Sequence, residues 1–134
     1  MMELQEIGRE SLEQIKALYL LEGWLAYLGD DSKLARALDN SLYTLGVFDK
    51  GDLVAFVRCL GDGEHAVLVQ DLLVKDGYKR QGLGTRLMRH VFEKYAYVRW
   101  LQVNTDLNDE RANLFYLSLG MRKVEEGSVV SYFR

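Results

Sequence analysis

The feature that most constrains the fold is a strand-like stretch, a glycine-containing loop and a helix-like stretch in direct succession. Residues 65–74 are apolar and β-favouring, and the apolar side chains of residues 83–95 recur at helical spacing. Residues 98–103 favour a strand again. A strand, a helix and a strand in a passage of this length predict a right-handed crossover that joins two parallel strands.

Two further β-favouring stretches precede this passage. Residues 42–48 and 53–60 flank the turn Asp49-Lys50-Gly51-Asp52, which predicts a hairpin. The turn Gly61-Asp62-Gly63 then leads into residues 65–74. The simplest topology is a three-stranded antiparallel meander next to the parallel pair. Together these strands form one mixed sheet in an α/β fold.

Helical patterns lie on both sides of these strands. Ser11 and Gln14 have the spacing of a capping box, which predicts a helix over residues 12–24. The polar residues 30–32 suit the N-cap of a short second helix.

The carboxyl-terminal part contains one more helical pattern. Residues 109–119 have an apolar face, and Gly120 follows where a helix commonly ends. Residues 122–125 and 129–133 are β-favouring, so the chain is predicted to finish with two short strands.

The composition fits one domain over residues 1–134. A chain of this length with 49% hydrophobic residues can bury a single core, and it contains no repeat, linker or proline. A net charge of -3 argues against a nucleic-acid partner held by phosphate contacts. No stretch approaches the roughly 20 apolar residues that span a bilayer, and residues 1–8 lack an export signal, so we expect a cytoplasmic protein with no membrane partner.

The sequence has no metal-ligand spacing. His65 and His90 are isolated and Cys59 is the only cysteine, so no metal is predicted. Cys59 lies in an apolar run, which favours a buried strand residue over a catalytic thiol. A lone cysteine also suits a reducing compartment.

The loop before residues 83–95 carries the strongest chemical signal. Gly82 and Gly84 let the backbone approach a bound group, Lys79 and Arg80 add positive charge, and a helix N-terminus favours an anion. The loop lacks the Lys and Ser or Thr of a P-loop, and Leu87 stands where a dinucleotide fingerprint has its third glycine. A phosphate ligand of another class is predicted, and a tight turn without a ligand is the alternative.

Two motifs resemble the GCN5-related N-acetyltransferases, the GNAT family. Their pyrophosphate loop has the pattern Gln or Arg, x, x, Gly, x, Gly or Ala, and residues 79–84 match it except that Lys79 stands first. The family's second signature resembles Ala112, Phe115-Tyr116 and Gly120-Met121.

A narrower resemblance comes from the amino-terminal part. Gly23-Trp24, Lys33-Leu34 and the run from Ala37 to Ser41 are similar to the start of the plastid-type aralkylamine acetyltransferases and their bacterial relatives. This implies an amine acceptor, although the substrate itself need not carry over.

The resemblance implies the GNAT fold, in which an antiparallel meander adjoins a splayed pair of parallel strands and helices flank the sheet. The family's first strand would lie within residues 3–8. Acetyl-CoA is the implied co-substrate, with its pantetheine arm along the strand before the loop and its pyrophosphate in the loop. The residues assigned to acetyl-CoA are Leu72, Leu73, Val74, Lys79, Arg80, Gln81, Gly82, Leu83, Gly84, Thr85, Asp109, Ala112 and Phe115.

Acetyl transfer to an amine needs a neutral amine, a polarised carbonyl and a proton for the departing thiolate. By the resemblance, Tyr116 is the predicted general acid, and a backbone N–H in residues 72–74 polarises the carbonyl. Asp71 is a candidate for accepting the proton of the amine, and a structural Asp71 is the alternative. Asp106 is a candidate for binding the ammonium group.

The family roofs its acceptor site with the segment that here contains Trp24 and Tyr27, which are predicted to shape the amine pocket, with ordinary packing as the alternative. The predicted function is N-acetylation of a small primary amine, such as an aralkylamine or a polyamine. The alternatives are acetylation of a protein lysine or amino terminus, and a non-catalytic module that senses acetyl-CoA. Dimerisation is common in the family, which leaves a homodimer open.

Overall fold

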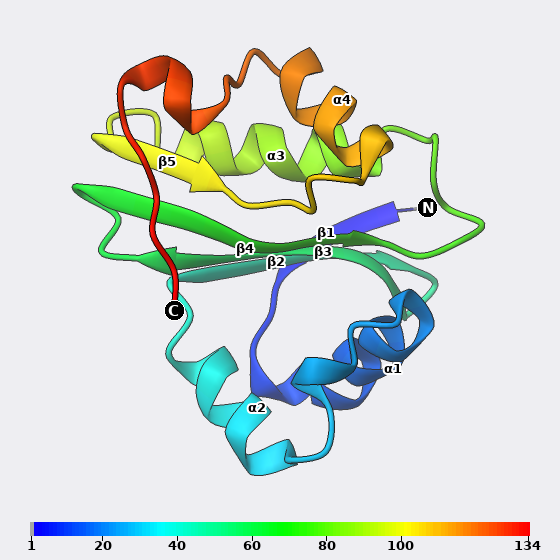
Figure 1. The fold of residues 1–134 in the computed structure, drawn as a ribbon. Helices are drawn as coiled ribbons and strands as arrows, with labels where there is room; N and C mark the ends of the chain where they lie inside the picture. Colours follow the sequence, from blue (N-terminus) through cyan, green and yellow to red (C-terminus); the bar gives the residue numbers. More distant parts are fainter. Residues whose placement is uncertain (1) are drawn as a thin grey trace. The chain divides into compact units, whose positions relative to one another are not determined.

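The computed structural model describes residues 2–134 and divides them into two compact units, residues up to Val103 and residues from Asn104. The first unit is a five-stranded sheet in the order β1-β2-β3-β4-β5, with helices on both faces (Figure 1). Its strands are β1 (Met2–Glu6), β2 (Tyr43–Asp49), β3 (Asp52–Gly61), β4 (Ala66–Val74) and β5 (Trp100–Val103).

The strand pairings confirm the predicted mixed sheet. Strands β1 to β4 pair antiparallel in chain order, and β5 pairs parallel with β4 after the crossover through α3 (Leu83–Lys94). The first strand implied by the resemblance is present, with Met2 opposite Asp49. A GNAT-type arrangement of meander and parallel pair is therefore correct for the first unit.

Apolar residues on both faces of the central strands explain why the strand runs are almost continuously hydrophobic. The helices α1 (Leu12–Glu22) and α2 (Asp31–Asp39) lie on one face, and α3 lies on the other (Figure 1). A sheet covered on both faces buries side chains of both orientations. The core between α1, α2 and the sheet consists of Ile7, Ile15, Leu18, Tyr19, Leu34, Leu38, Leu53, Phe56 and Leu73.

The predicted N-cap of the second helix is confirmed, whereas the capping box of the first is wrong. Asp30 accepts a hydrogen bond from the N–H of Lys33 at 3.1 Å. The side chain of Gln14, however, binds the β2–β3 hairpin, accepting from the N–H of Leu53 at 2.7 Å. A tertiary contact thus takes the amide that the local motif would use at the helix start.

The second unit contains α4 (Glu110–Ser118) and a short 3-10 helix, η3 (Val124–Gly127). The two terminal strands predicted at 122–125 and 129–133 are wrong, because η3 occupies part of this segment and no strand is found in residues 104–134. Tyr132 and Phe133 are almost fully exposed. An isolated two-stranded hairpin is marginally stable in water, so β-favouring residues alone do not form one.

Candidate functional site

The parallel partner of β4 ends before β4 itself does. Pairing between β4 and β5 runs from Ala66 opposite Trp100 to Val69 opposite Val103, whereas β4 continues to Val74. Within the sheet of residues 2–103, residues 70–74 therefore have a strand neighbour only on the β3 side. Such a free strand edge presents N–H and C=O groups to an extended ligand. The predicted residues Leu72, Leu73 and Val74 lie on this open edge.

The glycine loop follows the open edge directly and ends at the start of α3. Gly82 is the N-cap of α3 with φ +78°, a left-handed conformation that favours glycine. A Cβ atom at Gly82 would meet no atom within 4 Å, so the backbone faces open space. No side chain caps the helix, which leaves the first-turn N–H groups pointing out of its end. These N–H groups belong to the predicted residues Leu83, Gly84 and Thr85.

Hydrogen bonds fix the loop to the sheet. The N–H of Lys75 donates to the carbonyl of Val54 at 2.8 Å, and the hydroxyl of Tyr78 donates to Asp49 at 2.7 Å. Gln81 donates across the loop to the carbonyl of Gly77 at 3.4 Å. The loop is therefore shaped before any ligand binds.

The positive charges of the loop differ in their surroundings. Lys79 lies 3.1 Å from a carboxylate oxygen of Asp76 and 3.5 Å from one of Glu22, so two carboxylates already hold its ammonium group. Arg80 is exposed and has φ +66°, unusual for a residue with a side chain. Arg80 is thus an exposed basic side chain of the loop that is not held by such a pair of carboxylates.

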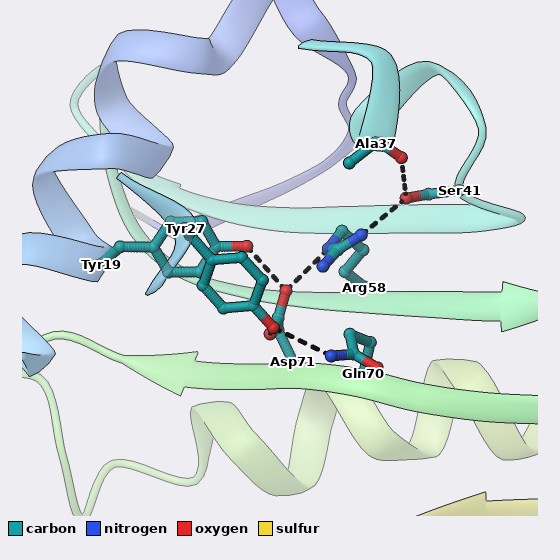
Figure 2. A network of polar contacts seen from close by, with 7 residues as sticks. All are labelled: Tyr19, Tyr27, Ala37, Ser41, Arg58, Gln70 and Asp71. Carbon is teal, nitrogen blue, oxygen red and sulfur yellow. Dashed lines mark hydrogen bonds and ion pairs between the residues drawn. The ribbon is translucent and has the colours of Figure 1, made fainter. Parts of the chain in front are cut away.

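Asp71 lies at the centre of a buried polar network (Figure 2). Its carboxylate accepts hydrogen bonds of 2.7 Å each from Arg58 Nε, from the hydroxyl of Tyr19 and from the hydroxyl of Tyr27. The side chains of Arg58 and Asp71 are 4% and 1% exposed, so this is a buried ion pair. Arg58 also donates to Ser41 at 3.2 Å, which ties the network to the end of α2.

A β-bulge brings two neighbouring side chains of β4 into this network. Arg58 pairs with Asp71 and Cys59 pairs with Val69, so Gln70 is the extra residue of the bulge. In a regular strand, consecutive side chains point to opposite faces. Here both Asp71 and Gln70 bond the hydroxyl of Tyr27, the latter at 3.0 Å (Figure 2).

This geometry weighs against Asp71 as a direct proton acceptor, although its role stays a prediction. The side chain is buried, and protonation would cost it the ion pair with Arg58. The contacts suit a positioning role, because Asp71 fixes two tyrosines and an arginine from three other elements. Burial raises the pKa of both Tyr19 and Tyr27, and the nearby Asp71 raises it further, so both remain donors.

Of the two predicted acceptor-site aromatics, only Tyr27 makes polar contacts with this network. Tyr27 lies in the short 3-10 helix η2 (Leu25–Tyr27), and its ring stacks on Tyr19 with centroids 4.3 Å apart. Trp24 is partly buried against the core beside Tyr19. Trp24 therefore fits ordinary packing. Tyr27 fits both ordinary packing and a role in shaping the amine pocket.

Arg58, Tyr19 and Gln70 were not among the predicted site residues. A usable signal was present, because Arg58 and Asp71 are single charges within apolar runs that the meander places side by side. Buried charges are paired, so the two opposite charges predict an ion pair. The bulge that recruits Gln70 has no comparable signal in the sequence.

The predicted residues of the second unit lie on and before α4. Asp109 is the N-cap of α4 and accepts from the N–H of Ala112 at 3.0 Å. Asp106 precedes the helix and accepts from the N–H of Asn108 at 2.9 Å. Phe115 and Tyr116 pack edge to face, with ring centroids 5.1 Å apart.

Tyr116 is suited to staying protonated. Burial, followed by the charge of Asp109, raises its pKa to about 12. Its hydroxyl has no hydrogen-bond partner among residues 104–134. The group is therefore a donor that the second unit itself does not use.

The one cysteine of the sequence, Cys59, is not suited to act as a catalytic thiol. Cys59 is fully buried, and burial raises the pKa of its thiol to about 12, which fits the predicted strand residue. No cluster of three metal-ligating side chains occurs among residues 2–134. None of the helices in this part of the chain is long and apolar enough to cross a membrane.

The profile described as the Acetyltransferase (GNAT) family matches residues 7–121. The chain belongs to this family. The match begins after β1 and ends just past α4, so it includes both the glycine loop and Tyr116. The protein is thus an acetyltransferase, as the two sequence motifs predicted.

Solved structures of other proteins have the same fold. A GNAT-family acetyltransferase from Streptococcus pneumoniae is 28% identical with a TM-score of 0.86, covering 100% of this chain and 97% of that one. An aminoglycoside N-acetyltransferase in complex with CoA is 17% identical with a TM-score of 0.77, covering 100% and 94% of the two chains. An aminoglycoside acetyltransferase from an uncultured soil sample, in complex with sisomicin, is 18% identical with a TM-score of 0.76, covering 99% and 95%. No curated protein sequence matches the chain.

Proposed function

We propose that this acetyltransferase uses acetyl-CoA to acetylate the primary amine of a small molecule. The observation that carries the proposal is the continuous segment from residue 70 to residue 85. It begins as a strand edge without a parallel neighbour and ends at the uncapped N-terminus of α3. The strand edge suits an extended ligand arm, and the helix N-terminus suits the phosphates that follow that arm.

The residues of the loop fit the phosphates of acetyl-CoA. A helix N-terminus carries about half a positive elementary charge, and its free N–H groups donate to an anion. In this proposal, Leu83, Gly84 and Thr85 donate to the pyrophosphate, and Gly82 leaves room for it. Arg80 adds an exposed positive charge.

The open edge of β4 is assigned to the pantetheine arm and the thioester. Acetyl-CoA supplies an acetyl group already activated as a thioester. A backbone N–H among Leu72, Leu73 and Val74 polarises the carbonyl, because a fixed donor stabilises the charge that develops on the oxygen. Tyr116 donates a proton to the departing thiolate, and its raised pKa keeps that proton available.

The proton of the amine leaves through water in this proposal. Asp71 is occupied by Arg58 and two tyrosines, so it holds the site in place instead of taking the proton. Asp106 is exposed, and one of its oxygens bonds the backbone of Asn108. We assign Asp106 to attracting the ammonium form of the acceptor.

Two points support a small molecule as the acceptor. Aminoglycoside acetyltransferases share the fold over almost the whole chain. The amino-terminal segment resembles the aralkylamine acetyltransferases, which also act on a small amine. An aralkylamine or a polyamine is therefore the first acceptor class to test.

The experiment measures thiol release from acetyl-CoA with a panel of aralkylamines, polyamines, aminoglycosides and lysine peptides. We expect turnover with at least one small amine, and about a hundredfold lower kcat for Tyr116→Phe with unchanged binding of acetyl-CoA. Tyr132→Phe removes an exposed hydroxyl from the same unit and serves as the control. Turnover with lysine peptides alone would indicate a protein acceptor instead of a small molecule. Binding of acetyl-CoA without any turnover would favour a sensor.

A further inference from the structure

Lys79 stands at the first position of the glycine loop, and its ammonium group faces two carboxylates. Its Nζ atom lies 3.1 Å from an oxygen of Asp76 and 3.5 Å from an oxygen of Glu22. One ammonium and two carboxylates together carry more negative than positive charge at neutral pH, so this cluster does not attract a phosphate. To bind one, Lys79 would first have to leave both carboxylates. The contacts therefore weigh against the phosphate-binding role that the family resemblance implies for this side chain.

The two carboxylates belong to different parts of the chain. Asp76 lies in the same loop as Lys79, and its side chain is 83% exposed. Glu22 is the last residue of α1, and its side chain is only 29% exposed. The ion pair with Asp76 therefore stays within the loop, whereas the ion pair with Glu22 joins the loop to α1.

The carboxyl end of α1 favours a positive charge from another element. A helix C-terminus carries about half a negative elementary charge, and Glu22 adds a full one. The last turn of α1 contains no basic residue that could offset this charge. The ammonium group of Lys79 lies beside Glu22 and supplies the missing positive charge.

The ion pair holds the loop close to the start of α3. Hydrogen bonds of Lys75 and Tyr78 to the β2–β3 hairpin fix the first half of the loop. Lys79 is the next residue, and its pair with Glu22 fixes the loop on the side of α1. Gly82, the N-cap of α3, follows three residues further along the chain. The loop is thus held by two different elements just before the first-turn N–H groups of α3.

We infer that Lys79 is a positioning residue, which ties the glycine loop to the end of α1 and does not itself bind phosphate. The inference rests on the proposed function, since the loop that Lys79 holds is the one assigned to the pyrophosphate. A loop that is ordered beforehand binds its ligand with a smaller entropy cost. Arg80 and the first-turn N–H groups of α3 remain as the donors to the phosphates.

The substitution Glu22→Gln separates the two roles of Lys79 by the sign of its effect. If Lys79 binds phosphate, Glu22→Gln frees the ammonium group and removes a nearby negative charge, so acetyl-CoA binds more tightly. If Lys79 is a tether, Glu22→Gln loosens the loop, and acetyl-CoA binds more weakly, as it does in Lys79→Met. Asp76→Asn is the matched control, because it removes an equal charge beside Lys79 but leaves the contact with α1 in place.

Calorimetric titration of acetyl-CoA into the full chain and these variants measures the sign. We expect about threefold weaker binding for both Glu22→Gln and Lys79→Met, the scale of a partly exposed ion pair. The double variant is expected to bind no more weakly than either single variant, because each already breaks the same pair. Asp76→Asn is expected to bind at least as tightly as the wild type. Tighter binding by Glu22→Gln, or equal affinities of Glu22→Gln and Asp76→Asn, would overturn the inference.

Hydrogen exchange of the ligand-free full chain tests the tether without acetyl-CoA. The amides of residues 79–82 are expected to exchange faster in Glu22→Gln than in the wild type, and at the wild-type rate in Asp76→Asn. High salt screens the ion pair and is expected to reduce this difference. Equal exchange in Glu22→Gln and the wild type would overturn the inference. A wild type that binds no acetyl-CoA would overturn the proposed function, whereas faster exchange in Glu22→Gln alone would still support the tether.

Discussion

Removing the charge of Arg58 tests whether the buried ion pair holds the amino-terminal helices on the sheet. Arg58→Met keeps the aliphatic length but leaves Asp71 as a buried carboxylate without a counter-charge. Breaking such a pair costs about 3–5 kcal/mol, a large part of the roughly 5–15 kcal/mol that stabilises a typical domain. The side chains are 4% and 1% exposed, so solvent screening reduces this cost little.

Urea unfolding followed by circular dichroism measures this effect. With a slope of about 2 kcal/mol/M, the midpoint is expected to fall by roughly 2 M. Arg9→Met is the control, because it breaks the exposed pair of Arg9 with Asp39 and is expected to leave the midpoint nearly unchanged. Adding Asp71→Leu and Tyr19→Phe to Arg58→Met removes the unpaired buried groups and is expected to restore most of the loss. A midpoint shift for Arg58→Met no larger than that for Arg9→Met would show that the buried ion pair does not hold the helices on the sheet.

Three further predictions follow from single groups. Because the pKa of Tyr116 is raised to about 12, kcat is expected not to fall between pH 8 and about pH 10.5; a pH–rate profile with a loss centred near pH 10 would indicate an ordinary tyrosine. Cys59 is expected to resist a disulfide reagent in the native protein at pH 8 and to react on unfolding, and rapid labelling of the folded chain would contradict its burial. Asp109→Ala removes the N-cap of α4 and is expected to cost about 1 kcal/mol in urea unfolding, whereas no change would show that the cap is not formed.

Local signals were sufficient for most of the sheet. The hairpin turn at Asp49–Asp52, the apolar strand runs and the amphipathic period of α3 each specify an element through its own residues. The parallel pair then follows from the length of the crossover. These features depend on neighbouring residues in the chain, so the sequence displays them directly.

Contacts between distant residues could not be predicted in the same way. Gln14 has two competing uses, and only the folded hairpin reveals that it binds the backbone of Leu53 instead of the start of α1. The network around Asp71 joins residues as far apart as Tyr19, Arg58 and Gln70 through a bulge whose position depends on strand register. At residues 129–133 a strand was predicted that does not form, because β-favouring side chains need a partner strand that the sequence does not specify.

The same distinction applies to the candidate site. The glycine loop and the motif around Tyr116 are local patterns and were found from the sequence. The direct role predicted for Asp71 relied on its residue type alone, and its three hydrogen-bond donors become visible only with the fold. The resemblance indicated Tyr27, but it did not indicate the hydrogen bonds of the Tyr27 hydroxyl with Asp71 and Gln70.

Calorimetric titration of acetyl-CoA into the wild type, Gly82→Ala and Gly23→Ala tests whether the glycine loop binds the pyrophosphate of acetyl-CoA. Both glycines have φ +78°, and at both a Cβ atom would enter open space, so the strain of about 1–2 kcal/mol is matched. Only Gly82 lies in the loop assigned to the pyrophosphate. We expect saturable binding to the wild type and to Gly23→Ala, with affinity reduced about tenfold or more in Gly82→Ala. No binding to the folded wild type, or equal affinities of the two variants, would contradict this expectation.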